Sequence, residues 1–438
     1  MNDGRPSEAL MRAVEVLWRM PRTENLRSTS AFKWFSKTVQ TDYPSAHSRE
    51  TQTLDFALER ALRALGLPYQ LPLERGDAHV PSQEAARLLD RAIRATRCRR
   101  RHLVPLDRAA VLPDLTFGPV RLGKLSETHL RELVNATRLE RLFPDLPFDV
   151  RLLSMFQWLV VEEELALDPN PAARASPFLF ETTTVRDFGQ VEPHKGRFPP
   201  AVEKALFAVL LAPWEEWSTK EPDWRGFRAP WVYTVDEDIF APCQPPRSAE
   251  TLTWESYDDQ FGEHIEFFRP WLDGDATRRG VAVFDDAHWS AVERALGSPL
   301  FETPVAHFFV RAFLSEGIDE FLAHLTTIEA ALGLQSDCCP KLRPKPDRHK
   351  RLEATGRLRG RIVALLEDSC AADLHKRLFD LRSCYLHGRP MKPISTKDRT
   401  EARKLARRVA EALVKQANEV SAPSSREEFL NCLLRSEY

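Results

Sequence analysis

Two side chains in the segment 378–389 are of types that can bind a phosphate and transfer a proton. Arg382 offers a permanently charged, planar guanidinium fork that suits a phosphate. His387, five residues later, offers an imidazole that exchanges a proton near neutral pH. An arginine that holds the phosphate and a histidine that moves protons are the minimum for attack by a 2′-hydroxyl on the RNA backbone. The pair therefore predicts a catalytic site that needs no metal.

Spacing alone is weak support for this site. Arg-x-x-x-x-His occurs at Arg97 to His102 and again at Arg382 to His387, and chance alone gives roughly one such pair in a chain like this. The second pair has the more suggestive setting, because a Tyr-x-His-Gly sequence follows at a predicted helix end. The further site residues that we expect are Ser383 and Tyr385 as supporting residues, and Arg389 and Lys392 as RNA contacts.

A carboxylate in an earlier predicted helix belongs to the same hypothesis. Glu329 follows Leu325 by four residues and precedes Leu332 by three, so it falls on an apolar stripe where an unpartnered carboxylate is costly to bury. It could pair with Arg382 or His387 across a helical bundle. It could equally lie at the edge of the stripe and reach solvent.

Motifs of several other enzyme classes are absent from the sequence. We find no Gly-x-x-x-x-Gly-Lys-Ser/Thr loop, no Gly-x-Gly-x-x-Gly, no His-Glu-x-x-His and no lysine preceded two residues earlier by a carboxylate. The acidic runs 236–238 and 285–286 are therefore interpreted as surface charge rather than a metal site. We expect no metal and no cofactor.

The elements that must position these residues are helices. From 304 to about 418, apolar residues recur at helical spacing in four segments, and Gly333 and Gly388 follow two of them as natural stops. Residues 341–415 hold 21 Lys and Arg against 9 Asp and Glu, a net charge of +12, which leaves -14 for the rest of a chain of net charge -2. A basic bundle attached to an acidic body hints at a polyanionic partner.

The preceding 300 residues have a different texture. Residues 1–104 have the spacing of helices, and the basic run 97–102 is interpreted as a solvated helix end. From 105 to 300, short β-like runs at 115–122, 156–165 and 178–184 alternate with helix-like pieces. We therefore expect a mixed fold, an N-terminal α+β region followed by an all-α bundle. The predicted domains are 1–104, 105–300, 301–420 and a tail at 421–438.

Length and cysteine content place the chain in a broad class. Its 438 residues suffice for two or three domains. The 7 cysteines include no Cys-x-x-Cys pair, so neither a disulfide framework nor a zinc ribbon is indicated. The sequence shows no signal peptide and no apolar run near the about 20 residues that cross a bilayer. We expect a cytoplasmic protein with no membrane partner.

The C-terminal motifs together resemble a known family. Residues 328–332 (Ile-Glu-Ala-Ala-Leu), the segment 361–366 and the Leu-Arg-Ser-Cys-Tyr-Leu-His-Gly of 381–388 resemble the HEPN superfamily, and look closest to its ApeA-like branch. The resemblance covers roughly residues 304–418. It implies a metal-independent endoribonuclease of prokaryotic phage defence or a toxin system, with a site formed where two bundles pair. Arg382 and His387 match the family's catalytic pair, and Ser383 stands where many members have Asn.

Three hypotheses follow. The first is a ribonuclease effector that forms a homodimer through the bundle. In this hypothesis residues 1–300 either sense a phage-derived trigger or restrain activity, because their acidic surface covers the basic site. The second is a catalytically silent HEPN module for dimerisation or for binding nucleic acid or a nucleotide. The third is a toxin controlled by a separate partner protein. An intact Arg382 and His387 pair favours the first.

Overall fold

The computed structural model describes the chain except for a set of short segments and the two ends. The residues outside the description are 1–4, 22–24, 47–50, 69–79, 110–112, 147, 176–195, 218–224, 253–254, 260–261, 267–273, 344, 346, 348, 389–392 and 437–438. The β-like run expected at 178–184 falls among them. The described chain is mixed, as the sequence predicts: it is mainly helical and has a five-stranded sheet of order β2-β3-β4-β1-β5. No described helix is both long and apolar enough to cross a membrane.

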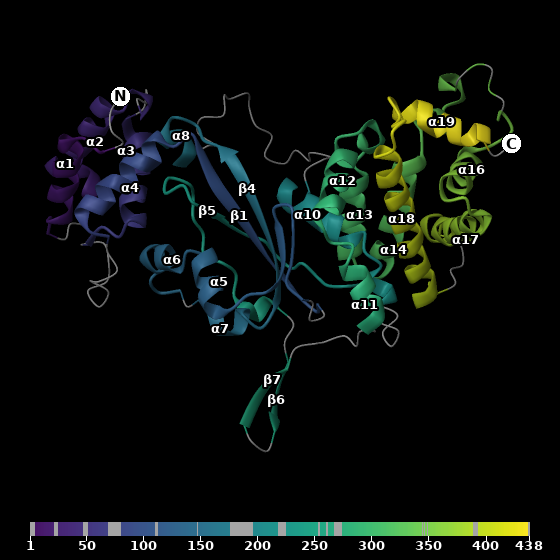
Figure 1. Cartoon of the computed structure of the whole chain (residues 1–438), viewed down its shortest axis with the longest axis horizontal. Helices are drawn as coiled ribbons and strands as arrows, with labels where there is room; N and C mark the ends of the chain where they lie inside the picture. The colour runs from purple at the N-terminus through teal and green to yellow at the C-terminus, as the bar shows by residue number, and fades with distance from the viewer. Residues whose placement is uncertain are drawn as a thin grey trace. The chain divides into compact units, whose positions relative to one another are not determined.

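The chain divides into two units, coloured by residue number in Figure 1. Unit 1 comprises residues 1–104, 124–190 and 231–252, and unit 2 comprises 105–123, 191–230 and 253–438. The first segment of unit 1 ends at residue 104, where the sequence suggested a boundary, whereas the predicted region 105–300 is divided between the two units.

Unit 1 is built from small helices and three strands of the five-stranded sheet. Its helices are α1 (Glu8–Trp18), α2 (Ser30–Asp42), α3 (Thr51–Ala64), α4 (Ser82–Arg94), α5 (Glu127–Leu133), α6 (Ala136–Leu142), α7 (Val150–Leu153) and α8 (Pro171–Ala175), with short 3-10 turns at Leu26–Ser28, Pro44–Ala46 and Ala249–Thr251. Its strands are β1 (Arg97–Leu106), β4 (Gln157–Ala166) and β5 (Tyr233–Asp236).

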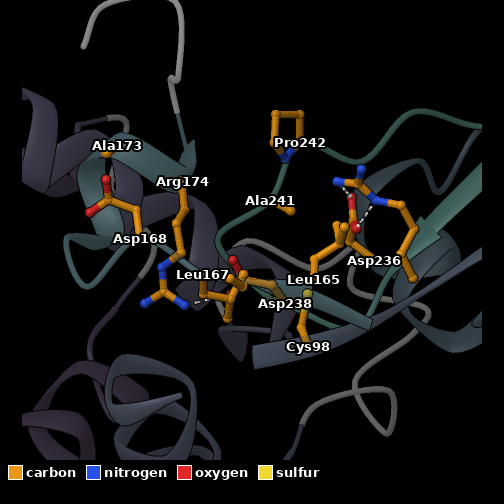
Figure 2. A pocket seen from close by; sticks show the side chains of 12 residues that line it. Cys98, Leu165, Leu167, Asp168, Ala173, Arg174, Asp236, Asp238, Ala241 and Pro242 are labelled. Atoms are coloured by element: carbon orange, nitrogen blue, oxygen red, sulfur yellow. Dashed lines mark hydrogen bonds and ion pairs between the residues drawn. The ribbon is translucent and has the colours of Figure 1, made fainter. Parts of the chain in front are cut away.

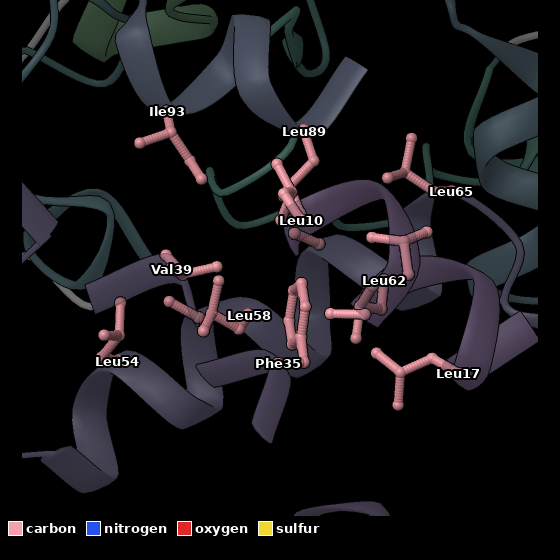
Figure 3. Close-up of a cluster of buried hydrophobic side chains, with 14 of the residues drawn as sticks. Leu10, Leu17, Phe35, Val39, Leu54, Leu58, Leu62, Leu65, Leu89 and Ile93 are labelled. Atoms are coloured by element: carbon pink, nitrogen blue, oxygen red, sulfur yellow. The ribbon is translucent and has the colours of Figure 1, made fainter. Parts of the chain in front are cut away.

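The N-terminal helices share one apolar core, drawn in Figure 3. Helix α1 begins where the Ser7 side chain accepts a hydrogen bond from the backbone N–H of Leu10, which satisfies one of the donors left free at a helix start. Its predicted stripe is buried, and Leu10 and Leu17 meet Phe35 of α2 in the cluster. The helical region predicted over 1–104 is thus confirmed in its described part as far as Arg94, the end of α4.

The basic run 97–102 is a β-strand, so its interpretation as a solvated helix end is wrong. In β1, side chains alternate between the two faces of the sheet, and its basic side chains pair with acidic residues of β4 and β5. Arg101 donates to Glu162 at 2.8 Å, Arg97 pairs with Glu164 at 3.1 Å, and His102 contacts Glu163 at 3.0 Å. Opposite charges across neighbouring strands stabilise the sheet, and one sequence segment does not reveal them.

Unit 2 contains the candidate site. Its strands are β2 (Leu115–Phe117), β3 (Val120–Lys124), β6 (Glu255–Asp259) and β7 (Gly262–Glu266). Its helices are α10 (Pro200–Leu210), α11 (Gly274–Val281), α12 (Asp286–Leu296), α13 (Val305–Leu314), α14 (Gly317–Leu332), α15 (Gln335–Cys338), α16 (Ala354–Leu366), α17 (Ser369–Leu386), α18 (Thr396–Ala417) and α19 (Arg426–Ser436), with 3-10 turns at Trp214–Glu216, Pro299–Phe301 and Pro340–Leu342.

The helices of 305–417 form a bundle, as the spacing predicts. Helix α14 packs against α13 and α18, and α16 packs against α17 and α18. The segment 421–438, which the sequence suggests is a tail, contains α19 packed on α16. Leu430 and Leu434 are buried, and the buried Arg426 donates to the carbonyls of Ala330 and Gly333 at the end of α14. A basic residue that caps another helix carries no recognisable sequence signal.

Candidate active site

Helix α17 presents the candidate residues at its C-terminal end. The helix begins where the Asp368 carboxylate accepts hydrogen bonds from the backbone N–H groups of Cys370 and Ala371. Ala371, His375 and Leu378 recur at intervals of four and three residues and are buried. This stripe fixes the rotation of α17 in the bundle, and Arg382 continues it one turn after Leu378.

Arg382 forms an ion pair with Glu329 across the bundle. Its Nη1 donates to Glu329 Oε1 at 2.5 Å, and its guanidinium carbon lies 5.6 Å from the centre of the Phe379 ring. The two charged side chains are 22% and 31% exposed. The sequence left open whether Glu329 pairs across the bundle or reaches solvent. In the structure, Glu329 of α14 pairs with Arg382 of α17.

The carboxyl group of this pair is modified by its surroundings. Burial raises the pKa of the Glu329 carboxyl above its ordinary value, and the neighbouring Arg382 opposes that rise. The ion pair uses only one terminal nitrogen of Arg382. Among the described residues, Nε and Nη2 of Arg382 have no hydrogen-bond partner, so this edge of the fork can accept a bidentate oxyanion.

His387 occupies the C-terminal cap of α17 and is exposed. The helix stops there because Gly388 adopts a left-handed φ of +61°, which favours glycine. The imidazole makes no hydrogen bond to any described residue. At about 100° per residue, five helical steps rotate a side chain by about 140° from Arg382. The shared cleft for Arg382 and His387 within one chain stays a prediction.

The remaining expected site residues are placed only in part. Ser383 is half-buried, and its backbone carbonyl accepts the N–H of His387. Tyr385 is 39% exposed, and its neighbour Leu386 is 53% exposed. Arg389 and Lys392 lie outside the described residues.

A histidine that sequence reasoning missed lies beside this site. His375 precedes Arg382 by seven residues on the same face of α17 and is 1% exposed. Neither ring nitrogen has a hydrogen-bond partner among the described residues. Burial lowers the pKa of His375 to about 4, and the charges of Arg359 and Arg382 add to the effect. Helical spacing from Leu378 could have identified it as a buried position.

The low pKa of His375 predicts a pH dependence of stability. Between about pH 6.5 and pH 4 the unfolded chain binds a proton here that the folded chain does not, so the free energy of unfolding falls as the pH falls. We expect His375→Leu to flatten this dependence, measured by denaturant unfolding at pH 7.5 and pH 5. A variant that loses stability as steeply as the wild type between these two values would contradict the assignment.

The positive charge of residues 341–415 is less accessible to a polyanion than the sequence suggests. Five arginines of 341–415 are paired with acidic residues from outside that window: Arg361 with Asp337, Arg382 with Glu329, Arg399 and Arg403 with Glu320, and Arg407 with Glu215. Arg361, Arg403 and Arg407 are buried. Four carboxylates from outside the window therefore offset part of the net charge of +12 inside unit 2, and a polyanion would meet a smaller positive charge.

The acidic run 236–238 is not a simple surface patch. Asp236 pairs with Arg100 at 2.6 Å, Glu237 pairs with Arg101, and Asp238 is buried beside Arg174 at 3.3 Å. Burial raises the pKa of Asp238, although Arg174 opposes the rise. In Figure 2, Arg174 and Asp236 stand on opposite sides of a cavity of about 400 Å³ in unit 1.

Metal binding finds no support in the part of the chain that the structure covers. No group of three or more His, Cys, Asp or Glu side chains that could hold a metal ion occurs among those residues. The carboxylates of 236–238 instead form ion pairs with Arg100, Arg101 and Arg174.

No family model, curated protein or solved structure matches this chain. The likeness of residues 304–418 to HEPN proteins therefore stays a prediction from the motifs. The candidate site comprises the Glu329 and Arg382 ion pair inside the bundle and the exposed His387, five residues further along at the C-terminal cap of α17.

Proposed function

We propose that this protein is a metal-independent endoribonuclease whose site is built from Arg382 and His387, with Glu329 as a positioning residue. The ion pair between α14 and α17 carries the proposal. It holds one nitrogen of Arg382 and leaves the Nε and Nη2 edge for a phosphate, while His387 stands exposed at the end of the same helix. Charge stabilisation at phosphorus and proton transfer are the two requirements of the reaction.

The chemistry balances without a cofactor. His387 would take the proton of a ribose 2′-hydroxyl while the 2′-oxygen attacks phosphorus. The bond from phosphorus to the 5′-oxygen breaks, that oxygen gains a proton, and a 2′,3′-cyclic phosphate remains. Arg382 would stabilise the charge that develops on the non-bridging oxygens. One imidazole cannot accept the first proton and donate the second in the same step, so the reaction favours a site that holds two copies of His387.

A second copy of the chain is the natural source of that histidine. Tyr385 and Leu386 are both exposed next to His387, and large apolar side chains grouped in this way favour an interface. A two-fold axis near the end of α17 would bring both histidines and both arginines around one phosphate.

We expect the full chain to be a dimer in solution. Replacing Leu386 by Asp should shift it to a monomer and remove cleavage together, because a charge at a buried apolar contact is costly. Light scattering at micromolar concentration measures the mass, and Val283→Asp, at a valine of unit 2 that is 48% exposed, is the matched control. A wild-type monomer that cleaves RNA would contradict the shared site.

Glu329 is expected to act through Arg382. Glu329→Ala removes the acceptor that orients the guanidinium and should lower cleavage about 10- to 100-fold, the scale of a misplaced group. Glu329→Gln retains an acceptor oxygen and should keep more activity than Glu329→Ala. The measurement is cleavage of total RNA by the purified full chain in EDTA. Equal losses in the two variants would count against positioning by this oxygen.

The biological role follows from the resemblance alone. We propose an effector of phage defence or a toxin, triggered by a phage product or by a partner protein. The alternative is a silent module that dimerises or binds nucleic acid, and it predicts RNA binding without cleavage in EDTA. The test must use the full chain, because Glu215 and Arg225, which pair with Arg407 and Glu320 of the bundle, lie before residue 301.

A further inference from the structure

A second set of polar side chains lines a separate cavity of unit 2. The cavity has a volume of about 370 Å³ and lies beside α10 and α13. Its polar lining comes from Arg197, Glu203, His307, Arg311 and Ser315. None of these residues belongs to the site at the end of α17.

A carboxylate and an imidazole form its centre. His307 Nδ1 lies 2.6 Å from Glu203 Oε1, and the two side chains are 19% and 15% exposed. Glu203 comes from the first turn of α10 and His307 from the first turn of α13. With Nδ1 engaged, the carboxylate fixes the ring, and Nε2 makes no hydrogen bond to the described residues.

Glycine at position 196 leaves room for this pair. A Cβ atom there would lie 2.3 Å from Glu203 Oε2 and 3.2 Å from His307 Nδ1. A side chain would therefore displace the carboxylate or the ring. The backbone of Gly196 therefore lies against the pair, and both side chains are held in a confined space.

Two arginines add positive charge to the cavity. Arg311 follows His307 by four residues, so both lie on one face of α13. It is exposed, and its guanidinium has no ion pair or hydrogen bond with the residues that the structure covers. One nitrogen of Arg197 donates to the carbonyl of Pro230, and its guanidinium carbon lies 5.3 Å from the Phe198 ring centre. Its other nitrogens make no hydrogen bond to the described residues.

We propose that this cavity binds the phosphoryl group of a small phosphorylated molecule. Arg197, Arg311 and His307 would donate to the phosphate oxygens, and Glu203 would hold the imidazole in place. Two guanidinium groups and one imidazole against a single carboxylate give a positive site, which suits a phosphate dianion better than a carboxylate. The volume fits a ligand up to the size of a mononucleotide.

The test is calorimetric titration of the full chain with inorganic phosphate, adenosine monophosphate and acetate. We expect phosphate and the mononucleotide to bind, with acetate at least about tenfold weaker. Arg311→Ala and His307→Gln should each weaken phosphate binding about tenfold or more. Arg351→Ala removes an exposed arginine elsewhere in unit 2 and should leave it unchanged. No binding of either phosphate compound at millimolar concentration, or equal weakening by Arg351→Ala, would overturn the proposal.

The positioning role of Glu203 has its own readout. In Glu203→Gln the imidazole ¹⁵N chemical shifts of His307 should change, and phosphate binding should weaken, while the thermal midpoint stays near that of the wild type. Unchanged ¹⁵N shifts would overturn the role of Glu203. Phosphate binding and RNA cleavage are measured separately on the full chain, so the absence of binding in this cavity and the absence of ribonuclease activity are separate results.

Discussion

Replacing His387 by Ala is expected to lower RNA cleavage by the full chain about 10²- to 10⁴-fold, the usual contribution of a positioned acid or base. The fold should be unaffected, because the side chain is exposed beyond the end of α17 and contacts no described residue through a hydrogen bond. Cleavage by the wild type should persist in EDTA and leave a 2′,3′-cyclic phosphate. The assay follows a labelled RNA by gel and identifies the end by mass.

Arg382→Lys tests the other half of the site. A lysine is a point charge and cannot both pair with Glu329 and present a planar fork to the phosphate, so we expect a loss of about tenfold or more. Arg377→Lys is the matched control on the same helix, since Arg377 pairs with Asp398 and Glu401 instead. A strict requirement for magnesium, or equal effects of the two substitutions, would contradict the mechanism.

Periodicity predicts the helices well where one face of a helix is buried. The stripe around Leu325 and Leu332 of α14, and the stops at Gly333 and Gly388, match the observed bounds. Glu329 was identified from its place on that stripe, because an apolar face makes a lone carboxylate conspicuous. Its partner could not be chosen from sequence, since the choice depends on how α14 and α17 are rotated against each other.

The sequence is misleading where long-range pairing decides the structure. The run 97–102 contains no apolar periodicity. Its local sequence therefore does not distinguish a solvated helix end from a strand whose arginines form ion pairs with carboxylates of the neighbouring strands. For the same reason Glu203 and His307, which are more than 100 residues apart, carry no joint signal. Their proximity depends on the packing of α10 against α13.

Arginines at buried positions are the largest departure from the sequence-based expectation. A net charge of +12 suggested a basic face, but Arg361 and Arg403 are 0% exposed and hold helices together. Arg361 of α16 donates to both carboxylate oxygens of Asp337 and to the carbonyls of Leu332 and Leu430. It therefore connects α14, α15, α16 and α19, and its charge serves stability rather than RNA binding.

Arg361→Ala is expected to lower the free energy of unfolding by about 3–5 kcal/mol, the scale for removing one partner of a buried ion pair. The loss arises because Asp337, 4% exposed, keeps a buried charge, and two backbone carbonyls lose a donor. Denaturant unfolding followed by tryptophan fluorescence and far-ultraviolet circular dichroism measures it.

Arg359→Ala, two residues away on the same helix, is the matched control for this prediction. Arg359 pairs with Asp373, whose side chain is 79% exposed, so the loss should stay at or below about 1 kcal/mol. Replacing Arg361 by Met together with Asp337 by Leu should recover part of the stability that Arg361→Ala loses, because it removes both charges and fills the space with apolar side chains. If Arg361→Ala were no more destabilising than Arg359→Ala, the buried ion pair would not hold the bundle together.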